Sequence, residues 1–182
     1  MKRSKLLIGM GVLVFFAVTA AYAQDAPDNK DRTSPLAIAA IRYKEAYVKI
    51  TYSQPQKNGR EIFGKLVPYG KVWRTGANEA TEITVTKNIS LHGFLLKAGT
   101  YSIFTIPDKE KWTIIINAEL GLWGAYNYNA RLDVLRFDVA PQVLSTEVSE
   151  AFTIQFDQRN ESADLMMVWD KVKVVVPVKF LN

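Results

Sequence analysis

The chain of 182 residues contains no cysteine and a single histidine, His92. The absence of cysteine excludes disulfide bonds, zinc sites with thiolate ligands, iron–sulfur clusters and a cysteine nucleophile. One imidazole is too few for a zinc site of the HExxH type, and no G-x-S-x-G motif accompanies it. We therefore expect neither a metal nor a cofactor, and we favour a protein without catalytic activity.

The N-terminal segment is typical of a secretory signal peptide. Lys2, Arg3 and Lys5 precede residues 6–21, a run of 16 almost uninterrupted apolar residues that leads into the small-x-small sequence Ala-Tyr-Ala. A membrane-spanning helix needs roughly 20 apolar residues. We expect residues 1–23 to be removed, which places the mature protein in the periplasm or outside the cell with no stable membrane anchor. An uncleaved anchor is the alternative.

Most of the excess positive charge belongs to that segment. The whole chain has a net charge of +5, whereas residues 24–182 contain 20 Lys and Arg against 18 Asp and Glu, a net charge of +2. No basic block remains, so nucleic acid is not an expected partner. Residues 24–34 are polar and predict a flexible leader. Residues 35–182 are enough for one domain with a substantial core.

Apolar and polar residues alternate along several short segments of this domain. These segments are 47–52, 82–86, 112–116, 152–157 and 171–179. Such alternation indicates half-buried antiparallel strands, and no segment shows a sustained helical period. The sequence predicts an all-β domain, a single antiparallel β-sandwich of about nine to ten strands. A β-barrel is the alternative.

Two long segments, 54–80 and 118–132, interrupt the alternation. Loops of this length in a compact domain are usually functional or disordered. Both segments are rich in aromatic residues, which argues against disorder. We therefore expect two long aromatic-rich loops that contribute to function.

The first long loop contains the densest group of candidate site residues. Trp73, Arg74, Asn78 and Glu79 place an indole, a guanidinium, an amide and a carboxylate within seven residues. Guanidinium groups bind carboxylates through paired hydrogen bonds, and indole faces bind sugars or apolar groups. Alternatively, these side chains fasten the loop to the sheet. We expect Arg74 to be partly buried and paired with Glu79 or, as second choice, Asp133.

Four further residues are candidate ligand-binding groups. Arg60 and Arg136 are cations that could bind an anion, although Arg136 could equally be a surface residue paired with an acid. Trp123 and Tyr126 lie in the second long loop and are suited to stacking on sugar rings. The alternative is that these rings cover the core.

Only carboxylates remain as candidate acid–base groups. Glu79 and Asp133 each lie near aromatic residues and an arginine. A glycosidase needs two carboxyl groups at a set separation, which the sequence does not determine. These two residues are the catalytic candidates if the protein is an enzyme.

Several stretches also resemble one known family. They are ITYSQP at 50–55, WRTGANEAT at 73–81, AGTYS at 98–102 and DVLR at 133–136. Together they make residues 35–180 similar to a family of exported bacterial proteins catalogued as domain of unknown function 2911. The resemblance implies export and a single β-rich domain, and it implies no activity.

These observations favour an exported, non-catalytic binding or structural module of the cell envelope. Its expected ligand is an unknown small molecule, either a glycan or a small anion, because aromatic rings and arginines gather in its loops. The alternative is a carboxylate-dependent hydrolase that acts on envelope glycans.

Overall fold

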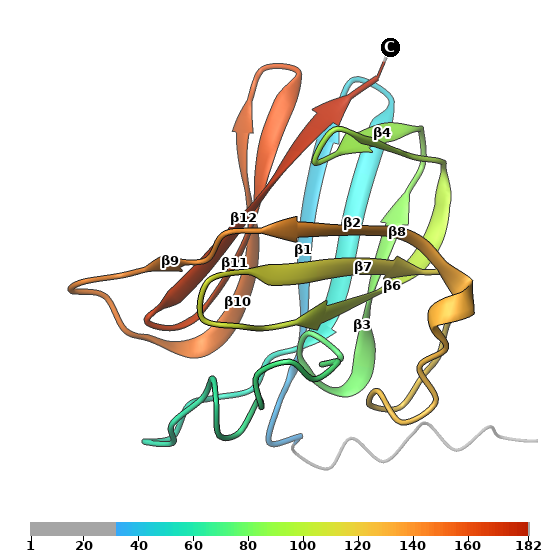
Figure 1. Ribbon diagram of the computed structural model, residues 1–182. Helices are drawn as coiled ribbons and strands as arrows, with labels where there is room; N and C mark the ends of the chain where they lie inside the picture. The colour runs from blue at the N-terminus through green and yellow to red at the C-terminus, as the bar shows by residue number, and fades with distance from the viewer. Residues whose placement is uncertain (1–31, 182) are drawn as a thin grey trace, which may run out of the picture. The chain divides into compact units, whose positions relative to one another are not determined.

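The computed structural model describes residues 32–181, and this part of the chain is built from β-strands (Figure 1). Its twelve strands are β1 (Leu36–Tyr43), β2 (Ala46–Ser53), β3 (Ala77–Val85), β4 (Ile89–Leu91), β5 (Phe94–Leu96), β6 (Gly99–Ile106), β7 (Trp112–Asn117), β8 (Asp133–Val139), β9 (Gln142–Val143), β10 (Ser149–Arg159), β11 (Ser162–Asp170) and β12 (Val172–Phe180). One short 3-10 turn, η1 (Ala130–Leu132), precedes β8. Within the described range, no helix is long and apolar enough to cross a membrane. The predicted signal peptide and residues 24–31 of the predicted leader lie outside that range.

The strands form two antiparallel sheets. The first has the order β1-β2-β3-β6-β7-β8, and the second has the order β10-β11-β12-β4-β5, with β9 pairing to β12. The first sheet twists, so that β1 and β2 run up the view of Figure 1 whereas β7 and β8 run across it. The sheets do not close into a barrel, and the predicted β-sandwich is confirmed. The count of nine to ten strands was too low, because β4, β5 and β9 are too short for an alternation to be visible.

The main core lies between the sheets and follows the predicted alternation. Val48, Ile50 and Tyr52 on β2 are at most 4% exposed, as expected for one buried face. Near one end of the core, five aromatic side chains contact one another with ring centroids 4.9 to 6.2 Å apart. They are Phe63, Trp73, Trp112, Phe152 and Trp169. Two of these rings belong to the first long loop, which is therefore anchored in the core.

A second, smaller core lies on the outer face of the first sheet. Phe104 on β6 and Ile115 on β7 are fully buried there, separate from the main core. Leu122, Ala125 and Tyr128 of the second long loop pack against this group. The loop thus covers a patch that would otherwise face water, and this explains why β6 and β7 are apolar on both faces.

Truncating the aromatic anchor of the first loop tests this packing. We expect Phe63→Ala to lower the free energy of unfolding by about 3–5 kcal/mol, because a buried aromatic is replaced by a cavity. Leu66→Ala, in the same loop but at a side chain that is 45% exposed, is the control and should change it by less than about 1 kcal/mol. Urea unfolding measures both. Equal effects of the two substitutions would contradict the anchoring.

Candidate functional site

The stretch from Trp73 to Asn78 forms a turn that is fastened on several sides. Trp73 and Thr105 of β6 exchange two backbone hydrogen bonds of 2.7 and 2.9 Å. The Trp73 indole nitrogen donates to the carbonyl of Gly76 at 3.0 Å. The backbone nitrogen of Thr81 donates to the carbonyl of Arg74 at 3.1 Å. Although irregular, the turn is therefore fastened to β6 and β3 by backbone hydrogen bonds.

The middle of this turn has an uncommon backbone conformation. Thr75 has φ of 57°, in the left-handed region that β-branched residues rarely adopt. Its carbonyl accepts a hydrogen bond of 2.6 Å from the Thr81 hydroxyl, and its own hydroxyl lies 3.1 Å from that of Thr105. A side chain at Gly76 would place its Cβ 3.0 Å from the Ser53 carbonyl oxygen. Such strain persists only where the surroundings impose it. The packing and hydrogen bonds around the turn therefore hold Thr75 in this conformation.

A pocket of about 410 Å³ opens beside the turn. It is lined by Thr33, Ser34, Pro55, Gln56, Asn58, Arg60, Leu66, Val67, Trp73, Arg74, Gly76, Ala77, Asn78 and Trp169. Four predicted site residues thus meet in one place: Arg60, Trp73, Arg74 and Asn78. The volume of the pocket lies within the range of about 300–1,000 Å³ that is common for small-molecule sites.

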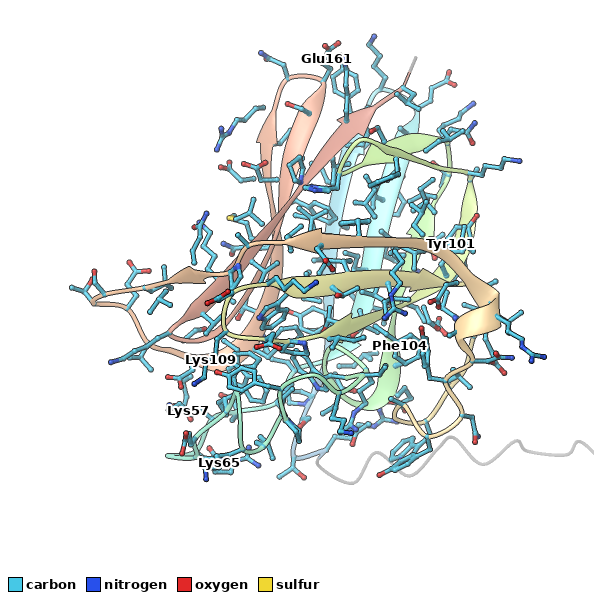
Figure 2. All side chains as sticks on the ribbon, in the orientation of Figure 1. Lys57, Lys65, Tyr101, Phe104, Lys109 and Glu161 are labelled. Carbon is cyan, nitrogen blue, oxygen red and sulfur yellow. The ribbon has the colours of Figure 1, made fainter. Side chains whose placement is uncertain are left out.

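The pocket belongs to the end of the sandwich where the first long loop lies. Lys57 and Lys65 of that loop lie at this end, and Glu161, in the turn between β10 and β11, lies at the other (Figure 2). The Lys57 ammonium contacts Asp170 at 2.7 Å, and the Lys57 backbone nitrogen donates to the Glu150 carbonyl at 2.6 Å. These bonds attach the loop to the second sheet, so both sheets support the pocket.

The pocket is positively charged. Arg60 and Arg74 line it, and no Asp or Glu is among its lining residues. The Nε of Arg74 is buried and has no hydrogen-bond partner among the described residues. Burial lowers the pKa of Arg74, while the nearby Tyr126 phenol raises it. Because a guanidinium stays protonated in proteins, Arg74 brings a positive charge to the pocket, while its Nε is buried without an acceptor.

Arg60 is arranged differently from Arg74. Its Nε donates to the Lys57 carbonyl at 2.9 Å, and one terminal nitrogen donates to the Gln56 carbonyl. Its side chain is therefore held by the backbone of its own loop. Arg60 contributes a fixed charge to the lining of the pocket, whereas Arg74 lines the pocket with its Nε buried and without an acceptor.

The expected ion pair of Arg74 with Glu79 or Asp133 was wrong. Glu79 binds Arg32 through two contacts of 2.9 and 3.0 Å and accepts a hydrogen bond of 3.3 Å from Ser53. The reason lies in the backbone: Asn78 has a left-handed φ of 56°, which turns the chain between the two side chains. Glu79 then lines a different hollow, shared with Leu36 and Glu82 among others, while Arg74 faces the cationic pocket.

Asp133 belongs to a separate polar network. It accepts hydrogen bonds from Asn117 at 2.8 Å, from the Tyr128 hydroxyl at 2.7 Å and from Arg136 at 3.3 Å. Burial and the bond to Asp133 raise the pKa of Tyr128 to about 12. Arg136 is thus a strand residue paired with an acid, the alternative that the sequence left open, and it does not line the cationic pocket.

The second long loop meets the first beside the pocket. The backbone nitrogen of Gly124 donates to the carbonyl of Asn78 at 2.9 Å, and that of Ala80 donates to the carbonyl of Leu122 at 2.8 Å. Trp123 and Tyr126 are 61% and 84% exposed. These two rings do not cover the core. That role falls to Tyr128, whose ring lies 5.0 Å from Phe104.

Some lining residues were not predicted from the sequence. Asn58 stands two positions before Arg60 in an Asn-Gly turn, so its nearness to Arg60 was visible. Trp169 comes from β11, and nothing local links it to the loop. Thr33 and Ser34, the last two residues of the predicted leader, also line the pocket. They directly follow Arg32, which forms the ion pair with Glu79.

Comparison with known proteins adds one finding. A sequence profile of the family described as "Protein of unknown function (DUF2911)" matches residues 34–178. The chain belongs to this family. The match includes every lining residue of the pocket except Thr33. No curated protein and no solved structure matches the chain. The resemblance carried by WRTGANEAT is thereby confirmed, and the family description names no activity.

No metal centre accompanies the pocket in the part of this DUF2911 protein that the structure describes. There, no group of three or more His, Asp or Glu side chains is placed to hold a metal ion. What the pocket offers chemically is a pair of guanidinium groups together with amide and hydroxyl side chains. Such groups bind anions and hydroxylated molecules.

The Arg32–Glu79 ion pair leads to a prediction about how the stability of the fold depends on pH. Burial raises the pKa of Glu79, but Arg32, a backbone hydrogen bond and Ser53 outweigh it and hold this pKa below its ordinary value. Such a carboxyl stabilises the fold above its unfolded pKa, and this stabilisation is lost as the pH falls through the folded pKa. We expect Arg32→Ala to raise the pKa of Glu79 and to weaken the fold at neutral pH but not in acid.

An NMR titration of the Glu79 carboxyl measures this change. Arg159→Ala is the control, because Arg159 pairs with Asp157 and Asp164 instead. An unchanged pKa of Glu79 in Arg32→Ala would contradict the assignment.

Proposed function

We propose that this protein is an exported, non-catalytic binding module whose cationic pocket takes a small anionic ligand. The observation that carries the proposal is the meeting of two arginines, Arg60 and Arg74, in a pocket that no carboxylate lines. Guanidinium groups bind carboxylates and similar anions through charge-assisted hydrogen bonds. An anion in the pocket would balance the two positive charges.

Export rests on the sequence of residues 1–23 and on the family resemblance. The charged start, the short apolar run and the Ala-Tyr-Ala sequence are the features of a cleaved signal peptide. A mature chain without cysteine is compatible with an oxidising compartment, because it has no thiol to protect. We place the binding module in the periplasm or outside the cell.

The alternative, a carboxylate-dependent hydrolase, has less support. A general acid of a glycosidase needs a raised pKa, whereas Arg32 and Ser53 help to hold the pKa of Glu79 below its ordinary value. Asp133 is hydrogen-bonded to three side chains outside the cationic pocket. Neither carboxylate lines the pocket that gathers the arginines.

Replacing Arg74 with methionine tests the proposal. Arg74→Met keeps an unbranched side chain but removes the unpaired donor, so we expect the melting temperature without ligand to stay the same or to rise. Citrate, succinate and phosphate, compared with chloride at constant ionic strength, are the probes. At least one should stabilise the wild type and bind Arg74→Met about 10- to 100-fold more weakly, as loss of a charge-assisted hydrogen bond implies.

Calorimetric titration and thermal melting measure these effects. Arg159→Met removes an exposed arginine outside the pocket and should leave the response to each anion unchanged. If none of the three anions stabilises the wild type, or if Arg74→Met responds as the wild type does, the proposed function is wrong.

A further inference from the structure

The residues that directly precede β1 contribute to the wall of the cationic pocket. Thr33 and Ser34 line it, and the chain runs through them into β1 at the end of the sandwich where the first long loop lies (Figure 1). Thr33 is exposed and Ser34 is half-buried, and neither hydroxyl makes a hydrogen bond with another described residue. Two hydroxyl groups that the described fold does not use thus border a pocket that gathers two arginines. We call residues 32–34 the strap.

The strap is fastened on both sides. On its C-terminal side, the Pro35 carbonyl accepts a hydrogen bond of 2.8 Å from the Gln54 backbone nitrogen, and the chain then enters β1. On its N-terminal side, the two terminal nitrogens of the Arg32 guanidinium contact the two carboxylate oxygens of Glu79 at 2.9 and 3.0 Å. Such a two-pronged contact fixes the direction of both side chains. The two hydroxyl groups therefore lie between two fixed points.

The ion pair of the strap lies outside the pocket that the strap lines. Glu79 lines the smaller hollow together with Leu36, and it is not among the lining residues of the cationic pocket. The side chains of Arg32 and Glu79 are 46% and 42% exposed. Exposed ion pairs contribute little to the stability of a fold. Loss of this pair should therefore loosen the strap and leave the sandwich folded.

We infer that the strap completes the anion site, with the Thr33 and Ser34 hydroxyls donating to the bound anion and the Arg32–Glu79 pair holding the strap in place. This inference rests on the proposed function and assigns further residues to that site. Hydroxyl groups donate readily to carboxylate and phosphate oxygens. If only a fraction of the molecules has the strap in place, the apparent affinity falls in proportion to that fraction. Arg32 and Glu79 are then positioning residues, which act on affinity without touching the anion.

Replacing Glu79 separates the strap from simple electrostatics. Glu79→Gln removes a negative charge next to a cationic pocket, so charge alone predicts equal or tighter binding of an anion. A loosened strap predicts binding that is about two- to five-fold weaker, as loss of an exposed ion pair implies. Calorimetric titration at constant ionic strength with citrate, succinate and phosphate measures the change, and the anion that the wild type binds most tightly serves as the probe.

Glu82→Gln is the matched control. Glu82 lines the same smaller hollow as Glu79, but its carboxylate accepts a hydrogen bond of 3.0 Å from the Gly121 backbone nitrogen and does not bind the strap. Glu82→Gln removes the same charge from the same hollow and should not weaken binding of the probe. Ser34→Ala keeps the ion pair but removes a hydroxyl, and it should weaken the probe about three- to ten-fold.

Exchanging the two charges supplies a rescue. Arg32→Glu and Glu79→Arg each place two like charges together, so each alone should weaken binding of the probe. Charge alone predicts the opposite for Glu79→Arg, because that variant adds a positive charge. The double variant restores an opposite pair and should recover most of the lost affinity, as expected for two residues that act through one contact.

Trypsin supplies a readout of the strap itself. Trypsin cleaves after arginine, and cleavage between Arg32 and Thr33 requires the Arg32 side chain to leave Glu79. When cleavage is slow, its rate follows the population of the open form. We expect Glu79→Gln to speed this cleavage about two- to five-fold, and the probe to slow it in the wild type. Cleavage after Arg159, at the end of β10, is the internal control and should not respond.

The outcomes separate this inference from the proposed function. If the probe binds through Arg74 but Glu79→Gln binds it as tightly as Glu82→Gln does, the strap is wrong and the anion site stands. Unchanged binding by Ser34→Ala would overturn the role of that hydroxyl, and no recovery in the double variant would overturn the role of the ion pair. If none of the three anions binds the wild type, the proposed function fails and this inference fails with it.

Discussion

The stacking of Trp73 on Trp169 is the contact on which the candidate site depends. The two rings are nearly parallel, with centroids 5.9 Å apart, and both are buried between the sheets. One ring comes from an irregular loop of the first sheet and the other from β11 of the second. Aromatic pairs of this kind stabilise beyond the area they bury. The stack thus ties the loop to both layers, and Arg74 follows Trp73 directly in the chain.

A rigid loop can hold a guanidinium in an unfavourable position. An arginine in a mobile loop would turn its Nε toward water, because an unpaired buried donor is costly. Here the left-handed Thr75, the close approach at Gly76 and the bonds to Thr105 leave the turn little freedom. The fold therefore maintains a local cost at Arg74. Strain kept by well-packed surroundings is common at binding sites.

The second long loop divides its side chains between packing and solvent. Leu122, Ala125 and Tyr128 cover Phe104 and Ile115 on the outer face of the first sheet. Trp123 and Tyr126 lie between them in the sequence and face water. The packing residues give the loop a fixed position, and the backbone bond from Gly124 to Asn78 joins it to the first long loop.

The sequence alone indicated five of the strand segments, the sandwich and the family, because period-two alternation and the WRTGANEAT stretch are local properties. It also named Arg60, Trp73, Arg74 and Asn78 as candidates, and all four line the same pocket. It did not determine the partner of Arg74 or the contribution of Trp169. Those depend on the direction of each side chain after the turn at Asn78 and on which strands face each other across the core. Only the packing of the two sheets decides such long-range contacts, because residues far apart in the chain meet there.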